Sequence, residues 1–131
     1  MNELSQEALY NLLYSAIDFG DSLFELWLTI TFAAILAVYF SSDRISRFMR
    51  ILLISLYSAS SILLTGRWVV AMIHYAHYQD VILTSGFAAY PTPPFAAVFG
   101  VLHFLLYVLG SVGTVYFMLS FENSSRASDG A

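Results

Sequence analysis

Two residue types are missing from this chain, and each absence excludes a class of site. There is no cysteine among the 131 residues, which excludes disulfides, iron–sulfur clusters and thiolate metal sites. There is no lysine either, so five arginines stand against nine acids, and the net charge is −4. Because these arginines form no basic patch, the sequence argues against nucleic acid as a partner.

Charge of either sign is also scarce. Charged residues make up 11% of the chain and hydrophobic residues 59%, against about 25% and about 45–50% in soluble domains. A soluble protein of this size needs a charged surface, and this composition does not supply one. Lipid must therefore solvate much of the outside. The acidic first 21 residues contain no cation, which is the wrong charge for a cleavable targeting peptide.

Three long apolar stretches account for most of the chain, at residues 23–40, 51–75 and 95–121. Each is close to the ~20 residues that cross a ~30 Å hydrocarbon core. We therefore predict an all-α integral membrane protein with three transmembrane helices in a single membrane domain, residues 1–131. The lipid bilayer is its first expected partner.

The arginines predict the orientation. The link at residues 41–50 contains Arg44, Arg47 and Arg50, whereas the N-terminal segment and the link at residues 76–94 contain no cation. Positive residues are retained on the cytoplasmic side of a membrane. We expect a multi-pass protein of a bacterial inner membrane, with the N-terminus and link 76–94 outside and the C-terminus in the cytoplasm.

The segments outside the apolar stretches have their own patterns. Apolar residues recur at helical spacing over residues 3–20, with acids on the other face, which predicts an amphipathic interfacial helix. We expect a bend at Gly20, between this helix and the first span. The acidic polar face favours packing against protein over anionic lipid. The polar tail at residues 122–131 is expected to be disordered.

Two opposite charges lie inside the apolar stretches. Glu25 and Arg67 both fall toward the outer ends of their spans, where an unpaired charge costs several kcal/mol. One interpretation is a structural ion pair, or two side chains that reach the headgroups separately. The other is a polar site for an ion, a quinone or an anionic group of a cofactor.

The histidines supply a second candidate site toward the same side. His74 and His77 are three residues apart, and His103 lies early in the third span. Histidines on neighbouring helices can hold a haem iron, and Arg67 would then face a haem propionate. The same residues also suit an interfacial belt of amphipathic rings. We therefore keep haem b as a possible cofactor beside that second interpretation, and assign no other metal site.

Small residues in the spans predict close helix contacts, since helices in lipid associate through packing and interhelical hydrogen bonds. The sequence contains no G-x-S-x-G, H-E-x-x-H or P-loop motif, and we assign no catalytic residue. The first hypothesis is a non-catalytic subunit or assembly factor of a larger membrane complex, with other subunits or copies of itself as partners. The alternatives are a haem- or quinone-binding anchor of an electron-transfer enzyme and a small self-assembling pore, similar in layout alone to one class of phage holins.

Overall fold

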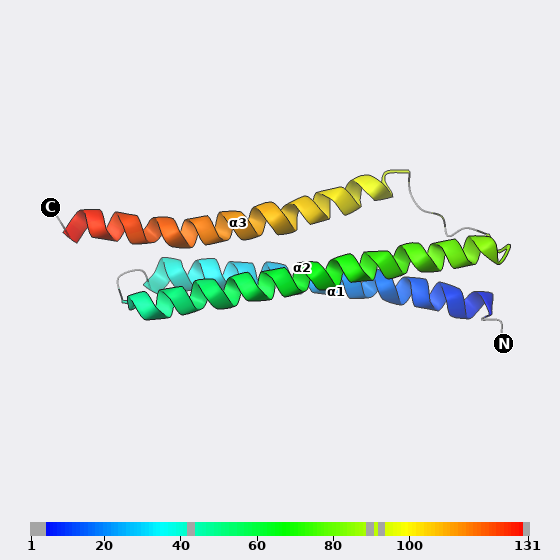
Figure 1. The fold of residues 1–131 in the computed structure, drawn as a ribbon, viewed down its shortest axis with the longest axis horizontal. Coiled ribbons are helices and arrows are strands. Elements are labelled where there is room, and N and C mark those ends of the chain that lie inside the picture. The colour runs from blue at the N-terminus through cyan, green and yellow to red at the C-terminus, as the bar shows by residue number, and fades with distance from the viewer. Residues whose placement is uncertain (1–4, 42–43, 89–90, 92–93, 130–131) are drawn as a thin grey trace.

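The computed structural model describes residues 5–41, 44–88, 91 and 94–129, and beyond Phe121 it describes the backbone alone. These residues form three helices and no strand: α1 (Gln6–Ser41), α2 (Arg47–Thr84) and α3 (Ala96–Asp129). α1 and α2 run antiparallel, and α3 runs in the same direction as α1 (Figure 1). We call the end of the bundle where α1 starts and α2 ends the Gly86 end, and the opposite one the Arg47 end.

All three helices are long and apolar enough to cross a membrane. They contain 36, 38 and 34 residues, which corresponds to about 50–57 Å at ~1.5 Å per residue. A hydrocarbon core is only about 30 Å thick. The predicted fold class is thus confirmed as far as an all-helical chain with three candidate spans, and each helix is longer than the span predicted for it.

α1 continues through Gly20, where we predicted a bend. Gly20 is buried, and a Cβ at this position would lie 2.9 Å from Met72 Cε and 3.8 Å from Trp68 Nε1. The glycine therefore permits a close approach between α1 and α2 and does not end a helix. The separate amphipathic helix predicted at residues 3–20 is not shown, since residues 6–20 form the first part of α1.

The apolar side of this first part of α1 is covered within the chain. Leu9 and Leu13 pack against Ile82 of α2, and all three side chains are buried. Tyr75, Tyr78 and Phe87 are among the partly buried residues around them. The acidic polar face led us to expect that this segment packs against protein. The last turns of α2 provide such a protein contact for its apolar side.

The end of α2 is fixed by a glycine. Gly86 has a φ of 76°, a backbone conformation that favours glycine. The Phe87 amide donates to the Ile82 carbonyl at 3.2 Å and the Gly86 amide to the Leu83 carbonyl at 3.1 Å. This pair of bonds is a Schellman motif, and its usual hydrophobic contact is made by Phe87 against the cluster around Ile82.

α1 and α2 bury stripes of residues that are spaced three or four positions apart. The buried residues of α1 are Leu9, Leu13, Ala16, Gly20, Leu23, Trp27, Thr31, Ala34 and Val38. Those of α2 between Tyr57 and Ala71 follow the same rule, at Tyr57, Ser61, Leu64, Trp68 and Ala71. This spacing is typical of helices that pack at a small crossing angle with side chains interlocked. α1 and α2 therefore form the closely packed helix pair of the bundle.

The links and the tail differ from the lengths predicted. α2 begins at Arg47 and ends at Thr84, so the links expected at residues 41–50 and 76–94 are shorter than their composition suggested. α3 continues as helix to Asp129, so residues 122–129 are not the irregular segment that their polar composition predicted. A helix already formed adds a hydrogen bond for each further residue at little cost. Residues 130 and 131 lie outside the described part of the chain.

Candidate functional site

A polar junction joins all three helices near the middle of the bundle. The Trp27 indole N–H donates to the Ser61 hydroxyl of α2 at 2.9 Å and to the Ser111 hydroxyl of α3 at 3.1 Å. The two hydroxyls also hydrogen bond each other. Trp27 and Ser61 are each 3% exposed and Ser111 is half-buried, so the three polar groups satisfy one another at the contact between the helices.

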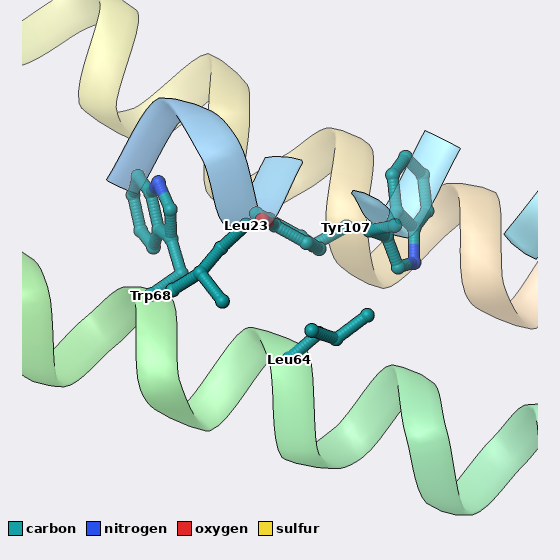
Figure 2. Close-up of a cluster of buried hydrophobic side chains, with 5 residues drawn as sticks. Leu23, Leu64, Trp68 and Tyr107 are labelled. Carbon is teal, nitrogen blue, oxygen red and sulfur yellow. The ribbon is translucent and has the colours of Figure 1, made fainter. Parts of the chain in front are cut away.

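An aromatic cluster lies next to this junction on the Gly86 side. The side chains of Leu23, Leu64, Trp68 and Tyr107 converge from the three helices (Figure 2). The Trp27 and Tyr107 rings lie 5.0 Å apart between centroids, and the Trp68 and Tyr107 rings 5.7 Å apart. The Tyr107 hydroxyl is buried and has no hydrogen-bond partner among the described residues. The cluster is thus aromatic and largely apolar, and it contains one buried hydroxyl that no described residue satisfies.

The polar junction marks one position along the bundle axis that the three helices share. We call this position the central level and measure the depth of other residues from it. Ser61 lies near the middle of the apolar stretch at residues 51–75, and Ser111 lies near the middle of the candidate span Ala96–Phe121. Glu25 precedes Trp27 by two residues, which places it about 3 Å from this level. Glu25 is therefore deep in the apolar part of the bundle, and not near its outer boundary as the start of its own apolar stretch suggested.

Arg67 lies at a different depth. It follows Ser61 by six residues, about 9 Å toward the Gly86 end, whereas His74 lies about 20 Å from the same level. A hydrocarbon core ~30 Å thick, centred on the polar junction, would contain both Glu25 and Arg67 and exclude His74.

Glu25 and Arg67 form no ion pair with each other, although both side chains are described. The Arg67 guanidinium instead lies over the Phe19 ring, 5.3 Å from its centroid. Glu25 is exposed, midway between the buried residues Leu23 and Trp27. Because each residue turns a helix by about 100°, Glu25 points away from the packed side of α1. A pair between these charges within one chain is thus not formed, and a pair between chains stays a prediction.

Arg67 and His74 share a groove between α1 and α2. The groove encloses about 700 Å³, and its described lining residues come from these two helices alone. His74 Nδ1 donates to the Val70 carbonyl at 3.0 Å, which leaves Nε2 as its remaining nitrogen. Arg67 and His74 therefore lie on the same side of α2.

The other two histidines lie apart from this groove. The His103 ring packs against Phe24 at 4.7 Å and is stacked on Trp68 at 6.2 Å between centroids, beside the aromatic cluster. The His77 ring contacts Tyr78 and is exposed at the Gly86 end. Within the described residues, no three histidine or acidic side chains are grouped as they would be around a metal ion. The histidines expected around a haem thus occupy separate surroundings.

Sequence reasoning missed the polar junction. Small residues in the spans, such as Ser61 and Gly110, were expected to permit close helix contacts, but the role of Trp27 was not predicted. A Cβ at Gly110 would lie 2.6 Å from Trp27 Cη2, so the glycine makes room for the indole. No signal in the sequence indicated this role, because Trp27 is the fifth residue of the stretch 23–40 and lies near a predicted membrane boundary, where tryptophan is common.

Comparison with known protein families, curated proteins and solved structures found no match to this chain. Its function is therefore inferred from the geometry of the chain itself.

Proposed function

We propose that this chain is a multi-pass membrane protein that serves as a small non-catalytic subunit or assembly factor of a larger membrane complex. Glu25 is the observation that carries the proposal. It is an ionisable side chain about 3 Å from the level of the polar junction, and it lies on the side of α1 that faces away from the rest of the bundle.

The Glu25 carboxylate lies at a depth where a charge is costly. A charged side chain at the centre of a membrane helix costs about 2.5–3.5 kcal/mol on insertion scales. Within the described chain no cation pairs with Glu25. A partner helix that carries a cation or a hydrogen-bond donor at the same depth would remove this cost. The exposed face of α1 around Glu25 is therefore the proposed contact surface.

The neighbouring charges extend this surface. Asp18, Asp21 and Glu7 are exposed on α1, and their spacing places them on the same side as Glu25. The acidic row continues from the apolar part of the helix to the Gly86 end. A partner with a complementary basic row would gain from charge pairs that become stronger as they enter the lipid.

Small residues without neighbours support further helix contacts. A Cβ at Gly66, Gly100 or Gly113 would meet nothing within 4 Å. Such positions let a second helix approach closely. They are consistent with assembly and do not by themselves name the partner.

Orientation is part of the proposal. Arg44, Arg47 and Arg50 all lie at the Arg47 end, and the sequence has no cation before residue 44 or between residues 68 and 125. By the retention of positive residues, the Arg47 end lies in the cytoplasm and the Gly86 end outside, in a bacterial inner membrane.

The test is affinity purification from the native membrane in mild detergent, with Glu25→Gln compared with Glu7→Gln. Glu7 is also exposed on the acidic side of α1 but lies about 27 Å further from the polar junction than Glu25. We expect the wild type and Glu7→Gln to retain the same stoichiometric partner and Glu25→Gln to lose most of it. Isolation of the wild type as a monomer, or equal retention by both variants, would overturn the proposal.

A further inference from the structure

The groove that contains Arg67 has a polarity that changes along its length. Its polar lining residues Ser15, His74 and Tyr78 lie toward the Gly86 end, where Leu12 also lines it, and its lining toward the middle of the bundle is apolar, at Ile62 and Leu63. Arg67 lies between the polar and the apolar parts. The lining of the groove thus becomes more polar toward the Gly86 end. The outer half of a bilayer changes in the same direction, from its apolar centre to its polar headgroups.

Arg67 is placed to bind an anion in this groove. Its side chain is exposed, and the ring of Phe19 supports its guanidinium. Asp18 and Asp21 do not line the groove, and Arg67 pairs with no described acid. A guanidinium is always charged and offers planar paired donors, which suit a phosphate group. At about 9 Å from the central level, the Arg67 backbone lies about 6 Å inside the edge of a core ~30 Å thick, and its long side chain reaches from there to the headgroups.

The apolar part of the groove continues toward the Arg47 end. A second groove of about 340 Å³ lies between α1 and α2 there, lined by Ala33, Ala37, Leu53 and Leu56 among others. Leu56 and Leu63 are seven residues apart and therefore lie on the same side of α2. The two grooves together provide an apolar path along the helix pair on the side of Arg67.

We propose that this path binds one anionic phospholipid of the surrounding bilayer. Its phosphate is held by Arg67, its headgroup lies toward His74, and an acyl chain lies along Leu63 toward Ala33. The charge of Arg67 selects an anionic headgroup, and the apolar path selects a chain. This site lies on the groove side of the α1–α2 pair and does not depend on a partner protein at Glu25.

The probe is phosphatidylglycerol, compared with phosphatidylcholine of the same acyl chains. Each is added to the purified full-length protein in mild detergent, and bound lipid is counted by native mass spectrometry. We expect the wild type to retain one phosphatidylglycerol and to bind phosphatidylcholine about tenfold more weakly, because the choline cation beside the phosphate repels the Arg67 guanidinium and offsets its attraction to the phosphate.

Arg67→Gln should weaken phosphatidylglycerol binding about tenfold or more. Arg44→Gln removes the same charge from the other end and should leave the binding unchanged. Val70→Trp keeps the charge and fills the groove, since Val70 is a half-exposed lining residue, and it should also displace the lipid. A thermal melt of each variant distinguishes loss of the site from loss of folding.

Equal binding by Arg67→Gln and the wild type would overturn the proposal, and so would equal loss in Arg67→Gln and Arg44→Gln, which would indicate a general charge effect. Equal retention of phosphatidylglycerol and phosphatidylcholine would overturn it as well, because the charge of Arg67 would then not select an anionic headgroup. Glu25→Gln should leave lipid binding unchanged, so failure of this site and failure of the proposed partner contact are separable.

Discussion

The Trp27 side chain lies so close to Gly110 that no residue with a side chain would fit at position 110. A Cβ on Gly110 would lie 2.6 Å from Cη2 and 2.9 Å from Cζ2 of the indole, well inside van der Waals contact. The same indole donates to hydroxyls on α2 and α3. Gly110 is therefore the position at which α3 accommodates the side chain that joins the three helices.

Gly110→Ala is expected to destabilise the bundle by about 1–3 kcal/mol, the usual cost of an added group in a filled core. The indole is rigid and held on both sides, so α3 must move away. Unfolding in detergent, followed by tryptophan fluorescence, measures the loss.

Gly113→Ala is the matched control on the same helix, since a Cβ there meets nothing within 4 Å. It should be neutral or should stabilise by up to about 1 kcal/mol, because alanine favours helix over glycine. Equal effects of the two substitutions would mean that the Trp27 contact does not limit the position of α3.

Two buried tyrosines predict opposite results when each is changed to phenylalanine. The Tyr57 hydroxyl hydrogen bonds Thr31 at 3.0 Å, and such a bond in a membrane protein contributes about 0.6 kcal/mol and at most about 1.7. The Tyr107 hydroxyl has no partner within the described chain. Tyr57→Phe should therefore destabilise by about 1 kcal/mol, and Tyr107→Phe should stabilise by a similar amount.

The same detergent unfolding assay checks both tyrosines. A clear loss of stability in Tyr107→Phe would show that this hydroxyl has a partner in the folded protein, such as an ordered water. An unchanged Tyr57→Phe would show that Thr31 is satisfied by another group.

The apolar stretches could be predicted from the sequence because the composition of a stretch depends on the solvent around it, and composition can be read without knowing any contact between helices. The ends of the helices could not. α2 continues through a mixed polar segment to Thr84 because Ile82 buries itself against Leu9 and Leu13 of α1. That contact joins residues about seventy positions apart, and no local pattern contains it.

The candidate site was predicted in its residues but not in its depth. Counting from the edge of its own apolar stretch places Glu25 near the boundary, level with Arg67. The hydrogen bond between Trp27 and Ser61 sets the register of α1 against α2, and it moves Glu25 toward the middle. The register between two helices is a property of their contact, so one helix read alone cannot supply it.

Gly86→Ala is expected to destabilise the last turn of α2 by about 1–2 kcal/mol, the cost of a left-handed backbone for a residue with a Cβ. The loss should also loosen Phe87, whose amide bond to the Ile82 carbonyl closes the helix. Amide hydrogen exchange at residues 85–87 should accelerate, with little change near Trp27. Gly66→Ala, in the open middle of α2, should not accelerate exchange at these positions. Unchanged exchange in Gly86→Ala would show that the cap contributes nothing.

Because the native chain has no cysteine, single cysteines report the orientation without background labelling. Ser85 is exposed at the Gly86 end and Ser46 is exposed at the Arg47 end, so the two positions lie at opposite ends of α2. In intact cells a membrane-impermeant maleimide should label Ser85→Cys and not Ser46→Cys, since the arginines beside Ser46 are expected to retain that end in the cytoplasm. Permeabilised cells should label both, which confirms that each thiol is reactive. The reverse pattern would overturn the orientation, and labelling of both variants in intact cells would mean that α2 does not cross the membrane between them.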